Sequence, residues 1–184
     1  MNKLALSVSA IMIAAAGANA AVIWDEGVNG DLSNDELAAP TVLGALAVGS
    51  NEVIATIDPF ASPIDEFDSF TFDVPAGTIL DQVILTSYST FTGGDGTSGI
   101  VAWDGPNATA PFLGGAGFGA ADAGSDIITT YDPSGDLGPG TYTFSIREFG
   151  GPGASYSLDF VVVPTPGAAG LLAVAGLAAA RRRR

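Results

Sequence analysis

The chain has 184 residues, with 20 acidic side chains against six basic ones, and it contains neither cysteine nor histidine. This length suits one domain with processed ends. The missing cysteine excludes disulfides, thiolate zinc sites and cysteine nucleophiles, and the missing histidine removes the base of serine–histidine hydrolases and the commonest transition-metal ligand. The composition therefore favours a non-enzymatic role.

The charges are unevenly distributed along the chain. All acidic residues lie between Asp25 and Asp159, and residues 21–163 contain one basic residue, Arg147, against 20 acidic ones, a formal balance of −19. Such a surface repels nucleic acid and anionic lipid and attracts cations. We therefore expect no nucleic-acid partner. A plain solvated surface that keeps the domain soluble explains the same balance.

Residues 1–20 have the pattern of a secretory signal peptide. Lys3 gives a positive start, a short apolar run follows over 4–16, and the small residues Ala18 and Ala20 precede a predicted cleavage point at Ala21. The run is too short for a comfortable membrane span, although an uncleaved anchor is the alternative. The sequence thus predicts export through Sec-type machinery.

Between residues 21 and 163 helical patterns are nearly absent and period-two alternation is common. The segment 69–74 is a clear example: Phe70, Phe72 and Val74 are predicted to face one side of the strand, and the residues between them the other side. The predicted strands are 51–57, 69–74, 79–88, 100–103, a weaker one over 126–131, 141–147 and 155–162.

The alternation predicts the fold class. Strands with one apolar and one polar face are typical of antiparallel sheets with one solvated side, and two such sheets pack into a sandwich. We therefore predict an all-β fold, an antiparallel β-sandwich over 21–163, flanked by the signal peptide and a short C-terminal hydrophobic helix. The glycine-rich link 150–153 has the length of a hairpin loop between the last two strands, and 89–125 reads as two exposed loops around a short strand.

The body of the chain resembles bacterial pre-peptidase C-terminal-like domains. The resemblance rests on short motifs spread over 24–163, namely Trp24-Asp25-Glu26, Gly30-Asp31-Leu32-Ser33-Asn34, Asp65-Glu66-Phe67-Asp68-Ser69-Phe70-Thr71-Phe72, Val74-Pro75-Ala76-Gly77-Thr78 and Gly138-Pro139-Gly140-Thr141-Tyr142. It implies a compact β-sandwich that serves as an accessory or binding module and has no catalytic activity of its own.

Acidic clusters are the candidate cofactor sites, since calcium takes six to eight oxygen ligands from carboxylates and carbonyls. We expect Asp65, Glu66 and Asp68, which precede a predicted strand, to form the calcium site if one exists. Two other groups are open alternatives: the acidic residues crowded at 25–36, and the pair Asp122 and Asp126. None has EF-hand spacing, and turn capping by aspartate explains the same residues without a metal.

Carboxylate pairs and aromatic rings are the residues of two further kinds of site. A carboxylate-pair hydrolase needs two acids at a set separation, and no spacing in this sequence marks such a pair. A sugar-binding face would use exposed rings, although most aromatic residues on alternating strands are core. The candidate rings are Trp24, Tyr88, Phe91, Trp103 and Tyr131. We expect burial for Trp103 and an ion pair across the sheet for Arg147.

The C-terminal tail has three parts. The proline motif Val163-Pro164-Thr165-Pro166-Gly167 leads into a run over 167–180 of only glycine, alanine, leucine and valine, and then come Arg181, Arg182, Arg183 and Arg184. As a helix the 14-residue run would span about 21 Å, short of a bilayer core of roughly 30 Å. The arginines would stay in the cytoplasm, with the domain outside.

This tail resembles the PEP-CTERM sorting signal of bacterial exported proteins. Pro164 and Pro166 match its two prolines, whereas Thr165 stands where the family has glutamate. The resemblance, over about the last 22 residues, implies transient anchoring in the inner membrane and cleavage near the proline motif by an exosortase. An uncut tail anchor is the alternative.

These observations give one functional hypothesis and one alternative. The first is a non-enzymatic, exported bacterial surface or extracellular-matrix protein that is processed by an exosortase-type sorting system, with residues 164–184 as the sorting signal. The alternative is a calcium-dependent adhesion module or a module that binds extracellular polysaccharide. No cofactor other than calcium is expected.

Overall fold

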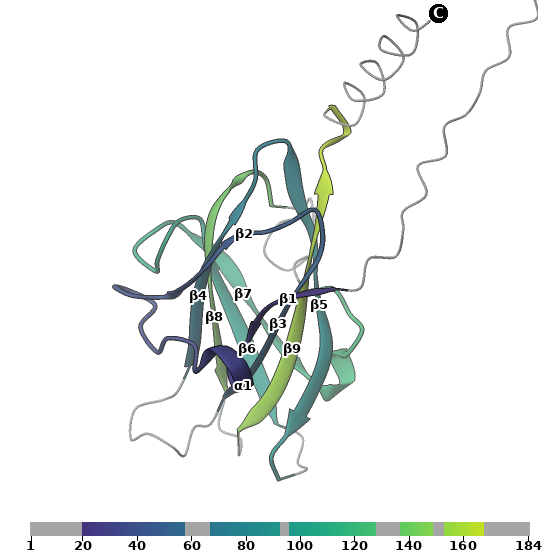
Figure 1. The fold of residues 1–184 in the computed structure, drawn as a ribbon. Helices are drawn as coiled ribbons and strands as arrows, with labels where there is room; N and C mark the ends of the chain where they lie inside the picture. Colours follow the sequence, from purple (N-terminus) through teal and green to yellow (C-terminus); the bar gives the residue numbers. More distant parts are fainter. Residues whose placement is uncertain (1–19, 58–66, 93–95, 128–136, 149–152, 168–184) are drawn as a thin grey trace, which may run out of the picture.

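The computed structural model describes residues 20–57, 67–92, 96–127, 137–148 and 153–167, and these are built almost entirely of β-strands (Figure 1). The predicted all-β sandwich is therefore confirmed. The elements are β1 (Ala21–Asp25), α1 (Glu26–Asn29), β2 (Thr41–Ala45), β3 (Gly49–Ile57), β4 (Phe67–Val74), β5 (Thr78–Thr90), β6 (Thr97–Trp103), β7 (Phe112–Gly119), the 3-10 turn η1 (Ala120–Asp122), β8 (Gly140–Glu148) and β9 (Ala154–Pro164).

The strands form two sheets that pack face to face. The four-stranded sheet has the order β1-β3-β9-β5, and the five-stranded sheet has the order β2-β4-β8-β6-β7. Most neighbours are antiparallel, as predicted. The edge strands β1 and β2 instead run parallel to β3 and β4.

Aromatic side chains fill the centre of the core between the sheets. Phe70 and Phe72 on β4 and Phe144 on β8 meet Phe160 on β9, and all four are at most 1% exposed. The Phe72 ring lies 5.1 Å from both the Phe144 ring and the Phe160 ring. Full burial of a phenylalanine contributes roughly 1.5–3 kcal/mol, so this cluster joins the sheets strongly. The predicted inward face of Phe70, Phe72 and Val74 is confirmed.

The predicted hairpin between the last two strands is wrong. β8 pairs with β4 and β6 in the five-stranded sheet, whereas β9 pairs with β3 and β5 in the four-stranded sheet. The link therefore crosses from one sheet to the other. Because facing sheets lie only about 10 Å apart, a short link fits a crossing as well as a hairpin. β4 and β5 change sheets in the same way after the turn 75–77.

The polar face of the five-stranded sheet is not solvated as predicted. Two connecting segments contact it: the Arg147 side chain pairs with Glu36, and the Thr143 hydroxyl donates to the Gly105 carbonyl at 2.8 Å. Ser69 and Ser145 are fully buried, with their hydroxyls 3.0 Å apart. The short hydroxyl side chains allow this close approach and satisfy one another's hydrogen bonds.

Three strands were not predicted. β1 and β2 are short edge strands, and β7 lies within the region predicted as exposed loops. Glycine suits β7 because a Cβ on Gly115 would stand 3.1 Å from the Ile100 carbonyl on β6. The weak strand predicted over 126–131 is described only at its start, where Asp126 forms an isolated bridge with Ile84. Residues 128–131 lie outside the described residues.

Candidate functional site

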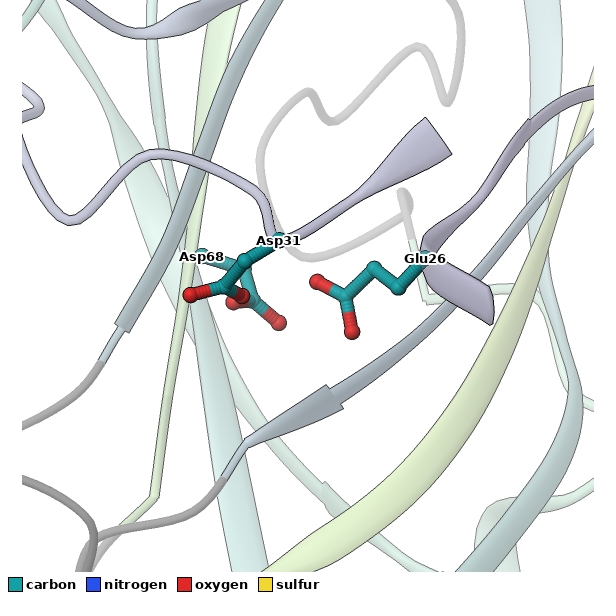
Figure 2. A group of neighbouring side chains, drawn as sticks. All are labelled: Glu26, Asp31 and Asp68. Atoms are coloured by element: carbon teal, nitrogen blue, oxygen red, sulfur yellow. The ribbon is translucent and has the colours of Figure 1, made fainter. Parts of the chain in front are cut away.

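Three carboxylates from separate parts of the chain meet at one end of the sandwich. Glu26, Asp31 and Asp68 each offer an oxygen that lies within 4.8 Å of the other two, and Figure 2 shows the Glu26 side chain pointing toward the two aspartates. Asp68 is fully buried, Asp31 is exposed, and Glu26 is half-buried. We call these residues the acidic triad.

The turn after β1 places Glu26. Asp25 caps the single turn of α1 by accepting from the Gly27 amide at 2.9 Å, which gives Glu26 its helical start. Gly30 then reverses the chain with φ near +90°, a conformation that favours glycine. The reversed chain brings the amide of Leu32, a buried core residue, to 3.1 Å from Glu26 Oε1.

Glu26 also fastens this turn to the end of β3. Its Oε2 accepts from the Thr56 amide at 2.6 Å and from the Thr56 hydroxyl at 3.0 Å. Burial raises the pKa of Glu26 above its ordinary value, the charge of Asp31 adds to the rise, and the three hydrogen bonds oppose it. Removing the Glu26 carboxylate from water therefore costs more than these hydrogen bonds restore.

Asp68 stands where the alternation of β4 calls for an apolar residue. It shares the inward parity of Phe70 and Phe72, and its Oδ2 accepts from the Tyr156 hydroxyl on β9 at 2.7 Å. This bond joins the two sheets at the end of the core. Burial raises the pKa of Tyr156 well above its ordinary value, and the negative charge of Asp68 raises it further. Tyr156 therefore stays protonated and donates to Asp68.

The acidic triad has the dimensions of a metal site. Calcium–oxygen distances of about 2.3–2.6 Å place two oxygens on one ion at most about 5 Å apart, and the triad meets this limit. Glu26 already accepts three hydrogen bonds, and a carboxylate has about four lone-pair positions, so it would offer one. Backbone carbonyls or water would supply the remaining ligands.

The triad differs from the predicted calcium cluster. Of the three residues expected there, Asp68 belongs to the triad, while Asp65 and Glu66 lie outside the described residues. Glu26 and Asp31 were among the acidic residues noted at 25–36, but no sequence pattern joined them to Asp68. The parity of Asp68 with the inward phenylalanines was the available signal that this aspartate is buried.

Of the other noted aspartates, Asp122 caps its own turn, whereas Asp126 contacts β5. Asp122 accepts from the Gly119 amide at 2.8 Å, and Asp126 accepts from the Val83 amide at 3.0 Å. The Asp122 contact fits the interpretation as turn chemistry, whereas the Asp126 contact joins its segment to β5, 43 residues earlier in the chain.

Arg147, the one basic residue of 21–163, forms its ion pair outside the triad. It pairs with Glu36 of the segment that contacts the five-stranded sheet, and its guanidinium lies 4.9 Å from the centre of the Phe67 ring. An acidic partner was predicted, although this one comes from a connecting segment and not from a neighbouring strand. The charge of the triad is therefore left without a basic side chain of 21–163 to balance it.

Burial removes two of the candidate sugar-binding rings. Trp103 is 9% exposed, as expected, and Tyr88 is 8% exposed with its hydroxyl 3.0 Å from that of Ser98. The Trp24 indole donates to the Gly30 carbonyl at 3.2 Å and so supports the turn beside Glu26. Phe91 is about half exposed, and Tyr131 lies outside the described residues.

The proline motif continues the fold for only a few residues. Val163 and Pro164 complete β9 opposite Ile79 and Thr78, and the Thr165 amide donates to the Gly77 carbonyl at 2.9 Å. Pro166 and Gly167 are exposed. No helix within the described residues is long and apolar enough to cross a membrane, and Arg181 to Arg184 lie outside those residues. At the other end, Ala21 begins β1, Ala20 precedes it, and Ala18 lies outside.

Comparisons with known proteins assign no family. No family model and no curated protein matches the chain. Among solved structures, the chain is similar to PliG of Salmonella Typhimurium, described as a periplasmic lysozyme inhibitor of g-type lysozyme. The identity is 12% and the TM-score is 0.38, over 68% of this chain and 100% of that chain. A likeness of this size assigns neither a family nor a function.

Proposed function

We propose that the protein is an exported, non-enzymatic module of the cell surface or extracellular matrix, and that residues 164–184 direct its sorting by an exosortase-type protease. The proposal comes from the sequences of the two ends and from the resemblance of the tail to PEP-CTERM signals. One geometric observation supports it: within the described residues, the last backbone hydrogen bond from the C-terminal segment to the sandwich is that of the Thr165 amide, inside the proline motif.

This boundary makes the tail separable from the fold. β9 lies between β3 and β5, so its residues through Pro164 are needed to hold the four-stranded sheet together. A cut on the C-terminal side of Thr165 would leave all of these pairs intact. At the other end, cleavage before Ala21 would likewise leave β1 whole. Both processing steps are therefore compatible with an intact sandwich.

The intact mass of the protein recovered from its native cells tests the proposal. We expect a chain that begins at Ala21 and ends between Thr165 and Gly167. The matched control replaces Arg181, Arg182, Arg183 and Arg184 with glutamine, which removes the charge that holds the tail's end in the cytoplasm, so this variant should escape correct processing. A native mass that still includes the arginines would contradict sorting by cleavage.

The acidic triad favours a second candidate, calcium-dependent adhesion or polysaccharide binding. Three carboxylates gather around a buried position, and the one basic side chain of 21–163 pairs with Glu36 instead. Like charges in such a place are stabilised by a bound cation or by protons. Asp31 is exposed, which leaves the triad open to an ion from solvent.

Thermal unfolding with and without calcium tests this candidate. Extracellular calcium modules have dissociation constants of about 0.1–1 mM, so about 10 mM calcium should stabilise the protein by roughly 1.4–2.7 kcal/mol. Asp31→Asn should abolish the shift while leaving the fold intact, because Asp31 is exposed. The exposed Asp81, on β5, provides the control Asp81→Asn, which should keep the shift.

The result separates the functions. Equal melting with and without calcium would exclude the triad as a calcium site. If calcium does stabilise the chain, retention on a polysaccharide column in calcium but not in chelator would support the binding module. Equal retention in calcium and in chelator would show that polysaccharide binding does not depend on the triad.

A further inference from the structure

The end of the sandwich opposite the acidic triad is formed by turns and strand ends that hydrogen bonds hold together. The Thr165 amide binds the Gly77 carbonyl, and the Leu46 amide binds the Asp73 carbonyl at 2.9 Å. In the sheets, Gly49 pairs with residue 162 and residue 74 pairs with residue 140. We call this surface the uncharged end; it comprises residues 45–49, 75–78, 138–140 and 164–167.

No residue of the uncharged end carries a charge, although residues 21–163 have a formal balance of −19. Its exposed side chains are small or apolar, and the largest is Val48, at 61% exposure. Among the described residues, Asp73, Asp81 and Glu52 are the acidic positions next to it along the strands. At the average density of residues 21–163, with 20 acidic residues in 143, the 16 residues of this end would hold about two acidic side chains, and they hold none.

The apolar tail leaves the fold at this same end. Thr165 is fixed to Gly77, and the apolar run begins at Gly167. Two residues of extended chain reach at most about 7 Å. Any surface that takes up the tail must therefore lie against the uncharged end.

The length of the run strengthens this restriction. As a helix its 14 residues would cover about 21 Å of a hydrocarbon core of roughly 30 Å. The arginines keep the far end at the cytoplasmic face, so the shortfall falls on the outer side. The domain is thereby drawn toward the outer headgroups rather than held away from them.

We propose that the uncharged end rests on the lipid headgroups of the membrane while the tail is embedded, with the acidic triad facing away. The inference rests on the membrane insertion of the tail in the proposed function. Charge favours this orientation, because anionic lipids repel the acidic remainder of the domain but not its uncharged end. The occupant of this surface is thus a bilayer.

Depth measurements on the tailed chain in vesicles test the orientation. The chain has no cysteine, so Val48→Cys and Val28→Cys each give one labelling site. Val28 is the matched control: it is 79% exposed on α1, beside the triad and toward the other end of the molecule (Figure 1). Each variant carries a fluorophore and is reconstituted with phosphatidylethanolamine, phosphatidylglycerol and a lipid with a nitroxide headgroup.

We expect the nitroxide lipid to quench the label at position 48 severalfold more than the label at position 28. Adding Ala76→Glu, at an exposed turn position, should reduce quenching at 48 because the new charge is repelled. A chain that floats with the vesicles but shows equal quenching at both sites overturns the orientation and leaves anchoring intact. A chain that does not float contradicts both the anchoring and the orientation.

Discussion

At the scale of single residues, the bond between Tyr156 and Asp68 is the most consequential polar contact of the core. Both side chains are at most 1% exposed, and the hydroxyl donates to a carboxylate at 2.7 Å. We predict that Tyr156→Phe destabilises the protein by about 1.5–3 kcal/mol, because it removes a hydrogen bond to a buried charge. Urea unfolding at neutral pH measures the change.

Tyr142→Phe provides the matched comparison. The Tyr142 hydroxyl donates at 2.9 Å to the Gly138 carbonyl, a neutral acceptor, so its loss should cost only about 0.5–1.5 kcal/mol. Equal losses for the two variants would show that the charge of Asp68 adds nothing to the bond.

Glu26 makes the stability of the calcium-free protein depend on pH. Its pKa in the folded protein is raised above the ordinary 4.5, chiefly by burial. As the pH rises from 4.5 through the raised pKa of the folded protein, Glu26 loses its proton in the unfolded chain before it does so in the folded one. The contribution of Glu26 to the free energy of unfolding is therefore lost over this window. Relative to Glu26→Gln, the native protein should therefore lose stability over this window. Unfolding free energies measured at a series of pH values would contradict this if the two curves stay parallel.

The residues of the triad show what a sequence can and cannot predict about a site. The aspartate at 68 was a candidate from its local cluster, and its period with Phe70 and Phe72 marks it as inward-facing. Its partners come from a turn about 40 residues earlier, and the hydrogen bonds of Thr56 and Leu32 bring Glu26 into place. Local patterns do not encode such contacts between distant segments.

At the scale of elements, Gly153 is the critical position of the link between β8 and β9. It adopts φ near +90°, and a Cβ there would stand 2.6 Å from the Phe91 ring and 2.7 Å from the Ile57 carbonyl. We predict that Gly153→Ala costs more than the roughly 1–2 kcal/mol of left-handed backbone strain alone. Thermal unfolding compares the variants.

Two other glycines separate strain from crowding. Gly44 has φ near +84° with open space around its Cβ position, so Gly44→Ala should show strain alone. Gly138 has open space and no left-handed conformation, so Gly138→Ala should be close to neutral. If Gly153→Ala lowers the free energy of unfolding no more than Gly44→Ala does, the Phe91 ring moves aside without an energetic penalty.

The strands themselves were largely predictable, whereas their arrangement was not. Alternation located β3, β4, β5, β8 and β9 because each buries one face in a common core. It gave no information about which sheet receives each strand, since a short link can turn back or cross the core. The glycine-rich β7 escaped prediction because its pattern lacks the apolar side chains that mark a buried face.

At the scale of the whole molecule, the two ends of the sandwich differ in chemistry. The triad gathers negative charge where β3 ends and β4 and β9 begin, and the uncharged end lies where β4 and β9 finish. The chain thus has a direction along its strands: the tail leaves from one end, and the cation candidate occupies the other. An anchored domain with this polarity would present the triad to the exterior.

The boundary of the fold at Thr165 gives the last prediction. A chain of residues 21–165 should unfold at the same urea concentration as 21–167, because the residues beyond Thr165 make no backbone pair within the described fold. A chain of 21–161 should be less stable. It lacks Val162, a fully buried side chain whose burial contributes roughly 1.5–3 kcal/mol, and it also loses the pairs of β9 with Gly49, Ile79 and Thr78. If 21–161 were as stable as 21–165, the end of β9 would not belong to the folded domain, and a protease could then cut within it as easily as beyond it.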